Sequence, residues 1–542
     1  MNKLFTQLVE KRCLNDDFLH PQYSKLIPAH EMPDMDKAIA RIKKAIKNNE
    51  KILIYGDYDV DGVTASTVME DTLILAGIKP DNTFIMLPDR FQDGYGMSPR
   101  LVTRAKETGV KLVITVDCGS RNHAIVEELN TLNIDTIITD HHECEDTLPD
   151  AVAIVNPKRK DFTGPASLKE MAGVGMAFKV AQGLVEEGTI KKGQEKWLLD
   201  LVLIGTICDN MLLTGENRIF GFYGIKVLEQ TRRPGLKELM KNAGVNKITS
   251  EAIGFQIGPR LNAAGRLETA EISLNLLRSK SGAEAAALAA ELELLNKKRR
   301  DEQRAATDEI SKRGISDDPV IIETGKWHEG ILGIVAGRLV EKYHKPAFVL
   351  SEVENNIFKG SARSFGDFNL AEALNYAKES IIGGGGHAGA AGVRIDGAKL
   401  YEFREKINAY YNSLNLKDQE KYLIKSADLE TDAIGDFNLD FMEDLSLLEP
   451  FGAGNEEPIF CIKNAIIDSV RTMGSDGQHL RIDIKGSDNK IIKCVVFNTP
   501  DKWKHLYRDE VYDFLIQPVI NEFRGTRSVE ARLVDILQTE SS

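Results

Sequence analysis

Short apolar, β-branched runs alternate with helical stretches between residues 51 and 209, and this alternation limits the possible folds more than any other feature of the chain. The strand-like runs are "KILIYGD" (51–57), "KLVITVD" (111–117) and "DTIITD" (135–140), with "ASTVMEDTLILAG" (65–77) and "HAIVEELNTLN" (123–133) between them. Strands and helices that alternate in this way form a parallel sheet covered by helices. The sequence therefore predicts a doubly wound α/β domain, which we place at residues 51–280.

Each strand-like run ends in acidic residues or histidine. The residues are Asp57, Asp59 and Asp61 after the first run, Asp117 after the second, and Asp140, His141 and His142 after the third. Asp209 ends a further apolar run, "LLDLVLIGTICD" (198–209), whose length favours a buried helix. The carboxyl ends of the strands form the ligand crevice of a doubly wound sheet, so these groups are expected to converge.

So many carboxylates in one crevice would not all stay ionised without cations between them. Oxygen ligands together with imidazole suit Mn²⁺ or Mg²⁺. Two such ions, roughly 3.5–4 Å apart, clamp the attacking and leaving oxygens of a phosphoryl centre. The alternative for any single aspartate is a turn residue or a helix cap, but four acid-tipped segments favour a two-metal site.

The rest of the chain divides into further segments. Residues 1–50 are expected to pack on the catalytic domain as an extension, and 281–315 to form a connector helix rich in Ala, Glu, Leu and Lys. A second α/β domain is expected at 316–425. Five short strand-like runs beyond Pro450 predict a small β-barrel of the OB type at 426–542.

Composition restricts the class of protein. The chain has 542 residues, of which 42% are hydrophobic and 28% charged, with a net charge of −13. These values fit a globular enzyme and disfavour a nonspecific coat on nucleic acid. Six scattered Cys indicate a reducing compartment. No apolar run is long enough for a signal core or a membrane span, so a cytoplasmic location is expected.

Four motifs resemble those of a known family. "DYDVDG", "VDCG", "DHH" and "GTICD" are similar, in this order, to the motifs of the DHH phosphoesterases. Further segments are similar to the RecJ branch of single-strand-specific 5′→3′ exonucleases: "RFQDGYGMS", "GPRLNAAGRL", "KGSARSFGDFNLAEAL" and "LLEPFGAGNEEPIF". The fourth motif departs from the usual pattern, because Cys208 replaces an Ala and the Pro that normally follows is missing.

The resemblance implies specific ligands. Asp61, Asp117, His141 and Asp209 would form one metal site, and Asp57 and Asp59 the other, with Asp117 as a bridge. Asp140 would orient an imidazole, and His142 would face the substrate phosphate. Asp117, His141, His142 and Asp140 are therefore the expected catalytic residues.

The resemblance also implies groups that bind substrate. They are Arg90, Arg260, Asn262, Ser361, Arg363, Gly385, Gly386 and His387. Arg363 and Ser361 would recognise a terminal 5′ phosphate, and the run "GGGGHAGAAG" would bring backbone N–H groups to a phosphate. Each arginine could instead form a structural ion pair.

Two further sets of residues are open to opposite interpretations. Phe497, Trp503 and Phe523 could stack bases in the C-terminal barrel, although aromatics in a small barrel are more often core residues. The basic run "NKKRR" (296–300) could touch phosphates, but we interpret it as a solvated helix face.

The predicted function is that of a two-metal 5′→3′ exonuclease that degrades single-stranded DNA in repair and recombination. A helicase and a single-strand-binding protein are the expected partners, and the protein is expected to be a monomer. Two alternatives remain at this point: a catalytically inactive DHH-fold scaffold of replication or repair, and a DHH phosphodiesterase that acts on short oligoribonucleotides.

Overall fold

The computed structural model describes residues 2–416, 419–474 and 477–538, and the chain divides into two compact units. One unit comprises residues 27–211 and 224–422, and we call it the catalytic unit. The other comprises residues up to 26, 212–223 and those from 423 onward, and we call it the barrel unit. Among the described residues, no helix is both long enough and apolar enough to cross a membrane.

A five-stranded parallel sheet forms the first half of the catalytic unit, with the order β2-β1-β3-β4-β5. Its strands are β1 (Ile52–Tyr55), β2 (Thr83–Met86), β3 (Leu112–Val116), β4 (Asp135–Thr139) and β5 (Ala153–Val155). Strands β1 and β3 are buried along their whole length, which explains why they read as continuous apolar runs instead of alternating ones.

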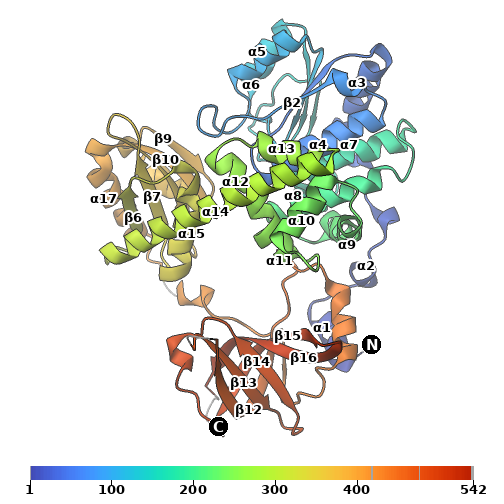
Figure 1. The fold of residues 1–542 in the computed structure, drawn as a ribbon. Coiled ribbons are helices and arrows are strands. Elements are labelled where there is room, and N and C mark those ends of the chain that lie inside the picture. The colour runs from blue at the N-terminus through green and yellow to red at the C-terminus, as the bar shows by residue number, and fades with distance from the viewer. Residues whose placement is uncertain (1, 417–418, 475–476, 539–542) are drawn as a thin grey trace. The chain divides into compact units, whose positions relative to one another are not determined.

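Helices cover both faces of this sheet (Figure 1). The helices around the sheet are α3 (Met35–Asn48), α4 (Val60–Leu75), α5 (Pro99–Thr108), α6 (His123–Thr131), α7 (Gly173–Glu186) and α8 (Leu199–Cys208). Apolar side chains of α5 and α6 form one core with Leu53 and Val113, whereas α4 and α7 contact the sheet and each other. The predicted doubly wound α/β fold is confirmed, and so is the buried helix before Asp209.

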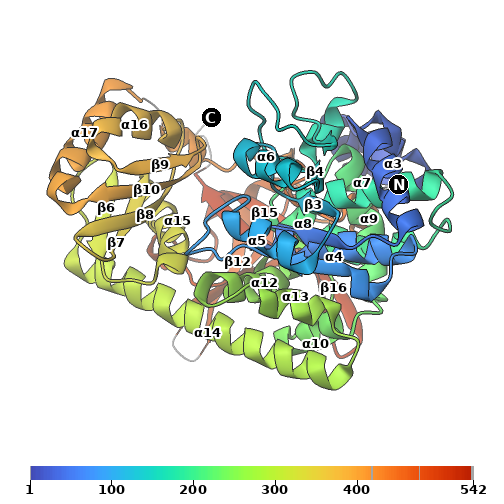
Figure 2. The same cartoon turned by 90° about the horizontal axis from the view of Figure 1, so that it is seen from above.

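Shorter helices complete this half of the unit. They are α10 (Pro234–Ala243), α11 (Ser250–Ala252), the π-helix η6 (Ile253–Ile257), α12 (Gly258–Leu267) and α13 (Glu271–Arg278); α9 (Gly215–Glu229) has residues in both units. Figure 2 shows one long helix, α14 (Gly282–Arg313), that packs against α10, α12 and α13 and continues to the second half. Its N-cap is Ser281, whose side chain accepts from the backbone N–H of Glu284.

The second half of the catalytic unit is a mixed sheet with the order β6-β7-β8-β10-β9. Its elements are β6 (Ile321–Gly325), α15 (Leu332–Tyr343), β7 (Ala347–Glu352), β8 (Ile357–Arg363), α16 (Leu370–Tyr376), β9 (Gly383–Gly386), β10 (Ala390–Asp396) and α17 (Leu400–Ser413). The first four glycines of the run "GGGGHAGAAG" form the edge strand β9, which pairs antiparallel with β10. Glycine has no strand preference of its own, so this strand depends on its pairing with β10.

The barrel unit holds a six-stranded sheet that closes through an additional pairing of β12 with β15. Its strands are β11 (Leu429–Thr431), β12 (Phe460–Met473), β13 (His479–Lys485), β14 (Ile491–Val496), β15 (Val511–Phe523) and β16 (Thr526–Leu537), and its helices are α1 (Lys3–Lys11), α2 (Asp16–Leu19) and α18 (Leu439–Leu445). The predicted OB-like barrel is confirmed, with β11 as an extra short strand.

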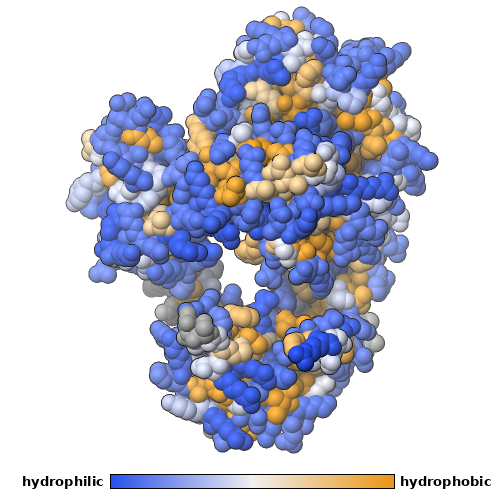
Figure 3. Space-filling model, viewed as in Figure 1, coloured by the Kyte–Doolittle hydropathy of each residue, from blue (hydrophilic) through white to orange (hydrophobic). Residues whose placement is uncertain are grey.

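The N-terminal extension is divided between the two units. Leu4, Phe5 and Leu8 of α1 belong to the apolar core of the barrel unit, whereas α3 contacts β5 and α7 in the catalytic unit. The sequence of an amphipathic helix shows that one face is apolar, but it does not specify which part of the protein that face packs against. Apolar groups are collected inside each unit, and the surface drawn in Figure 3 is largely hydrophilic. The domain boundaries given above stay predictions.

Candidate metal centre and substrate cleft

The loop after β1 places three aspartates around the start of α4. The Asp59 carboxylate caps α4 by accepting from the Gly62 backbone N–H at 3.0 Å. Asp57 is buried, and Asp61 lies in the first turn of α4, also buried. The helix-cap alternative is thus correct for Asp59, but a cap leaves the second carboxylate oxygen available as a ligand.

Asp61 is held by the N-terminus of a different helix. Its two carboxylate oxygens accept from the backbone N–H groups of Gly173 (2.6 Å) and Val174 (2.9 Å) in the first turn of α7. Free N–H groups and the positive end of the helix dipole stabilise a carboxylate there. Gly205 of α8 leaves the necessary room, because a Cβ at this position would lie 2.8 Å from the Asp61 Oδ1.

Asp117 and His141 meet at the carboxyl ends of β3 and β4. The Asp117 backbone is left-handed (φ 61°), a conformation that Asp tolerates better than most residues. The His141 Nε2 lies 3.0 Å from the Asp117 Oδ1, 3.7 Å from the Asp61 Oδ2 and 3.6 Å from the Asp209 Oδ2. Carboxylates from three segments distant in sequence therefore converge on one imidazole nitrogen.

Three overlapping groups of side chains could each hold a metal ion. They are Asp61, His141 and Asp209; Asp57, Asp59 and Asp117; and Asp117, His141 and His142, and within each group the ligand atoms lie within 4.8 Å of one another. We call Asp57, Asp59, Asp61, Asp117, His141 and Asp209 the acid cluster. The structure thus brings together all six residues that the sequence suggested as ligands.

Burial and mutual repulsion strongly perturb the acid cluster. Burial and the neighbouring Asp59 carboxylate raise the pKa of Asp57 to about 8 and that of Asp209 to about 7. Burial and the surrounding aspartates raise the pKa values of Asp61 and Asp117 well above their usual range. Burial lowers the pKa of His141 to about 3, so this imidazole is neutral at pH 7, as a metal ligand must be.

The residues present fit a pair of hard divalent cations. The Asp57 Oδ1 is buried and has no hydrogen-bond partner among the residues that the structure describes, which is costly unless a cation or a proton satisfies it. A set of five carboxylates and one imidazole has the donor chemistry of Mn²⁺ or Mg²⁺. Cations between the carboxylates would also remove the repulsion that raises their pKa values.

Asp140 organises the Asp-His-His turn. Its Oδ1 accepts from the backbone N–H groups of His141 (2.8 Å) and His142 (3.1 Å) and lies 2.9 Å from the His142 Nδ1. Its Oδ2 accepts from the Ser120 backbone N–H at 3.0 Å. These bonds hold the pKa of Asp140 below its usual range despite burial, and they raise the pKa of His142. Asp140 is therefore placed to orient the second imidazole.

Four arginines lie close enough to repel one another, and two of them, Arg90 and Arg266, also interact with the aspartates that follow β1. Within residues 2–416, 419–474 and 477–538, no ion pair with a carboxylate is found for Arg90, Arg266, Arg299 or Arg363, which we call the arginine cluster. Burial, and then the charges of the other three, lower the pKa of Arg266. Cations that repel one another and form no ion pair with a carboxylate indicate a binding site for phosphates.

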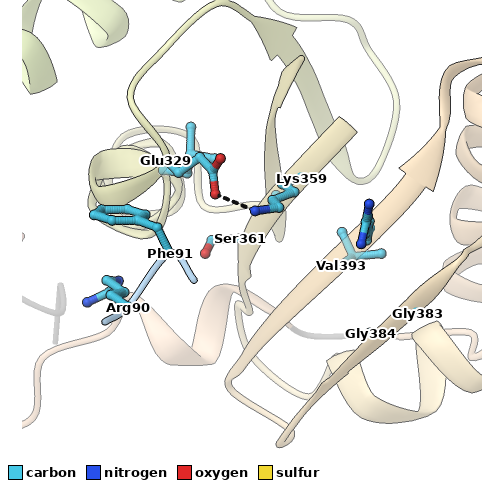
Figure 4. A pocket seen from close by; sticks show the side chains of 11 residues that line it. Arg90, Phe91, Glu329, Lys359, Ser361, Gly383, Gly384 and Val393 are labelled. Atoms are coloured by element: carbon cyan, nitrogen blue, oxygen red, sulfur yellow. Dashed lines mark hydrogen bonds and ion pairs between the residues drawn. The ribbon is translucent and has the colours of Figure 1, made fainter. Parts of the chain in front are cut away.

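A cleft of about 390 Å³ lies between the two halves of the catalytic unit (Figure 4). Arg90 and Phe91 line it from the loop after β2, and Ser361 and Lys359 line it from β8, with Lys359 paired to Glu329. Phe91 also meets His328 edge to face at 5.5 Å between ring centroids. The cleft is therefore lined on one side by the loop after β2 of the first sheet and on the other by strands of the second sheet.

The remaining predicted substrate residues occupy different positions. Gly385 and Gly386 are exposed on β9, and His387 is exposed in the turn that follows, where its N–H donates to the Ala390 carbonyl. Asn262 is half-buried on α12. Arg260 is paired with Glu293 at 2.5 Å, so its charge is already matched, as in the ion-pair alternative.

The structure separates the aromatic candidates of the barrel and corrects the interpretation of the basic run. Trp503 is part of the apolar core, whereas Phe497 and Phe523 are 69% and 65% exposed.

In the run 296–300, Asn296 and Arg299 are buried, and the Arg299 guanidinium donates to the Asn296 side-chain oxygen. The prediction of a solvated face was wrong for these two residues, because α14 packs against other helices of the unit, α10 and α12 among them.

Three functional candidates escaped the sequence analysis. Arg266 lies in the same motif as Arg260, and Arg299 was assigned to the surface. Tyr95, whose hydroxyl lies 2.8 Å from the His142 Nδ1, sits in the motif "RFQDGYGMS", where only Arg90 was singled out. Motif membership was the available signal, but it does not tell which member faces the site.

Comparisons with known proteins agree with this architecture. The "DHH family, N-terminal domain" matches residues 51–206, the "DHHA1 domain" residues 317–413, and the "RecJ OB domain" residues 428–535. A curated protein of Salmonella typhimurium named "Single-stranded-DNA-specific exonuclease RecJ" is 31% identical over 94% of this chain and 91% of its own length. The chain belongs to the RecJ family.

Other RecJ proteins extend the comparison. The Bacillus subtilis RecJ is 36% identical over 96% of this chain, and the matched part spans 66% of that protein's length. The crystal structure of Thermus thermophilus RecJ in complex with Mn²⁺ superposes with a TM-score of 0.85 at 27% identity, over 100% of this chain and 76% of that one. A Mg²⁺ complex of the same RecJ gives a TM-score of 0.79.

Proposed function

We propose that this protein is a metal-dependent exonuclease that hydrolyses single-stranded DNA to mononucleotides in the 5′→3′ direction, in DNA repair and recombination. The observation that carries the proposal is the presence, in one compact unit, of a buried acid cluster suited to divalent cations and an arginine cluster without carboxylate partners. The RecJ relatives that match most of the chain are named single-stranded-DNA-specific exonucleases.

The acid cluster would hold two Mn²⁺ or Mg²⁺ ions. Asp61, His141 and Asp209 would hold one, Asp57 and Asp59 the other, with Asp117 between them. When bound, the ions would supply Lewis acidity to the phosphoryl oxygens and lower the pKa of an attacking water. Of the two Thermus thermophilus RecJ crystal structures described above, one contains Mn²⁺ and the other contains Mg²⁺.

The protein's own groups would bind and orient the strand. The arginine cluster and Ser361 would hold the 5′-terminal phosphate, because Arg can bond a phosphate through two parallel N–H groups. Backbone N–H groups of β9, which carries no side chains, could approach a second phosphate closely. His142, fixed by Asp140 and Tyr95, would meet an oxygen of the scissile phosphate. A phosphate site beside the acid cluster makes the chain end the preferred substrate.

Partners and location are also part of the proposal. The exposed Phe497 and Phe523 of the barrel would stack bases of the strand outside the catalytic unit. A nuclease limited to single strands needs a helicase to open duplexes, and it shares its substrate with a single-strand-binding protein. We infer that the protein acts as a monomer in the cytoplasm, where bacterial DNA lies; the RecJ relatives described above are bacterial.

End-labelled strands test the proposal. The purified protein with Mn²⁺ is incubated with single strands labelled at either end, with and without a 5′ phosphate, beside an Asp117→Ala variant. Mononucleotides that appear first from the 5′ label, and not with the variant or with chelator, are the expected result. Equal release by the variant, or release first from the 3′ label, would contradict the proposal.

A further inference from the structure

One large aromatic side chain near the acid cluster has no role in the function described so far. Phe255 is 79% exposed, more than either Phe497 or Phe523 of the barrel, and it lies in the π-helix η6. Exposure of a whole Phe side chain costs about 1.5–3 kcal/mol relative to burial. π-helical turns occur frequently at functional sites.

The glycines beside Phe255 place η6 against the acid-bearing helix α8. A Cβ on Gly258 would lie 2.5 Å from the Cys208 Sγ, and one on Gly254 would lie 3.9 Å from Ile207. Cys208 directly precedes Asp209 of the acid cluster. η6 and the first residue of α12 therefore pack against the end of α8, directly before Asp209. The Phe255 ring lies on the solvent side.

Helix α12 continues from η6 along the acid cluster to the arginine cluster. Near its other end, a Cβ on Gly265 would lie 2.7 Å from the backbone oxygen of Tyr58, which stands between Asp57 and Asp59. The next residue is Arg266. Phe255 precedes Arg266 by eleven residues, which corresponds to about 16 Å along a helix axis at the helical rise. The helix therefore spans the site from the phosphate-binding end to the Asp209 end.

The π turn itself is held in place by an ion pair. The Arg260 guanidinium donates to the Gln256 carbonyl at 2.7 Å and pairs with Glu293 of α14. The residue next to Phe255 is thereby tied to the connector helix. An exposed aromatic ring on a fixed backbone has the properties of a stacking platform, because little conformational entropy is lost when a base covers it. Apolar residues also reach the hydrophilic surface over α12 in Figure 3.

We propose that Phe255 stacks on a base of the DNA strand on the 3′ side of the scissile phosphate. The inference rests on the proposed function: with the 5′ phosphate at the arginine cluster and the scissile phosphate at the acid cluster, the uncut strand leaves past Asp209, where Phe255 lies. Every base has a π face, so the contact is independent of sequence. Phe255 would fix the register of the strand after each cut.

Binding of strands that lack single bases tests this inference. Affinities are measured in the Asp117→Ala background with 5′-phosphorylated strands of about 12 nucleotides, each with one abasic position among the first six. Base stacking on an aromatic contributes about 1–3 kcal/mol, so Phe255→Ala should weaken binding of the complete strand about tenfold. At one of these six positions, loss of the base should weaken binding to the protein with Phe255 by a similar factor. The same loss should have no effect on binding to the Phe255→Ala variant.

Two variants serve as controls. Phe255→Trp should bind within about threefold of the parent, because a larger ring keeps the stacking face. Tyr401→Ala removes an aromatic of similar exposure (75%) from α17, and it should leave binding unchanged. Tyr401 is a suitable match because α17 packs its Phe403 against Phe348 on the β-sheet of the second half, far along the chain from the acid cluster.

The outcomes separate this inference from the function on which it rests. If the protein neither binds nor cuts single strands, both fail. If it cuts them but Phe255→Ala binds as tightly as the parent, or the abasic penalty is the same in both proteins at every position, only the stacking role of Phe255 is refuted. A lower unfolding temperature of Phe255→Ala without loss of the abasic effect would show that the ring packs on protein, which also refutes it.

Discussion

Replacement of Arg266 by methionine tests whether the arginine cluster exists to bind phosphate. Among its described contacts, the guanidinium makes one hydrogen bond, to the Gly330 carbonyl at 3.3 Å, and it is repelled by Arg90, Arg299 and Arg363. Loss of one neutral bond costs about 0.5–1.5 kcal/mol. Relief of the repulsion offsets that cost, so the free energy of unfolding should change by less than about 1 kcal/mol.

Activity should respond very differently. A hydrogen bond to a charged group contributes about 1.5–3 kcal/mol, which corresponds to a decrease of about 10- to 150-fold in kcat/KM. The assay is release of mononucleotides from 5′-phosphorylated single strands, measured together with the thermal unfolding midpoint. A midpoint shift under about 3 °C with the large kinetic loss is the expected pattern.

Arg278→Met is the matched control. Arg278 forms two hydrogen bonds with Glu70, at 2.7 and 2.6 Å, and Glu70 is buried. Its removal leaves a buried carboxylate unpaired, so the midpoint should fall while kcat/KM of the folded enzyme changes little. The reasoning is refuted if Arg266→Met loses stability as Arg278→Met does, or if it keeps full activity.

Further predictions concern metal affinity, pH and the barrel unit. Gly205→Ala should weaken Mn²⁺ binding at least tenfold in calorimetry, because its Cβ crowds the Asp61 carboxylate, whereas Gly337→Ala, with open space around it, should not; equal affinities would contradict this. In metal-free protein, burial and repulsion raise the pKa of Asp209 to about 7 and that of Asp57 to about 8. The folded state therefore binds more protons than the unfolded state, and the free energy of unfolding should fall as pH rises from about 4 to about 8. Mn²⁺ should abolish that slope in thermal unfolding, and a slope of the opposite sign would refute the assignment. Arg218→Met should destabilise the barrel unit by about 3 kcal/mol in denaturant unfolding, because the buried guanidinium donates to backbone carbonyls of residues 447–449; an unchanged unfolding midpoint would show that these bonds are replaced by water.

Local patterns were sufficient for several elements. The 32-residue helix α14 follows from its composition and its Ser281 cap, and the apolar run before Asp209 forms the expected buried helix. β9 was not foreseen, because glycine has no strand preference of its own and pairs there only because β10 lies beside it. Trp503 entered the core, which its sequence neighbours do not reveal.

The sequence alone determined the parallel sheet and the set of acidic residues at its carboxyl edge, because strand periodicity and the position of each acid at a strand end are local properties. Tertiary structure alone decided how each charge is used. Arg260 and Arg266 belong to one short motif, yet Arg260 is neutralised by Glu293 of α14, and Arg266 has no carboxylate partner among the described residues. The electrostatic state of a side chain depends on partners that are near in space and far in sequence, and no local pattern records them.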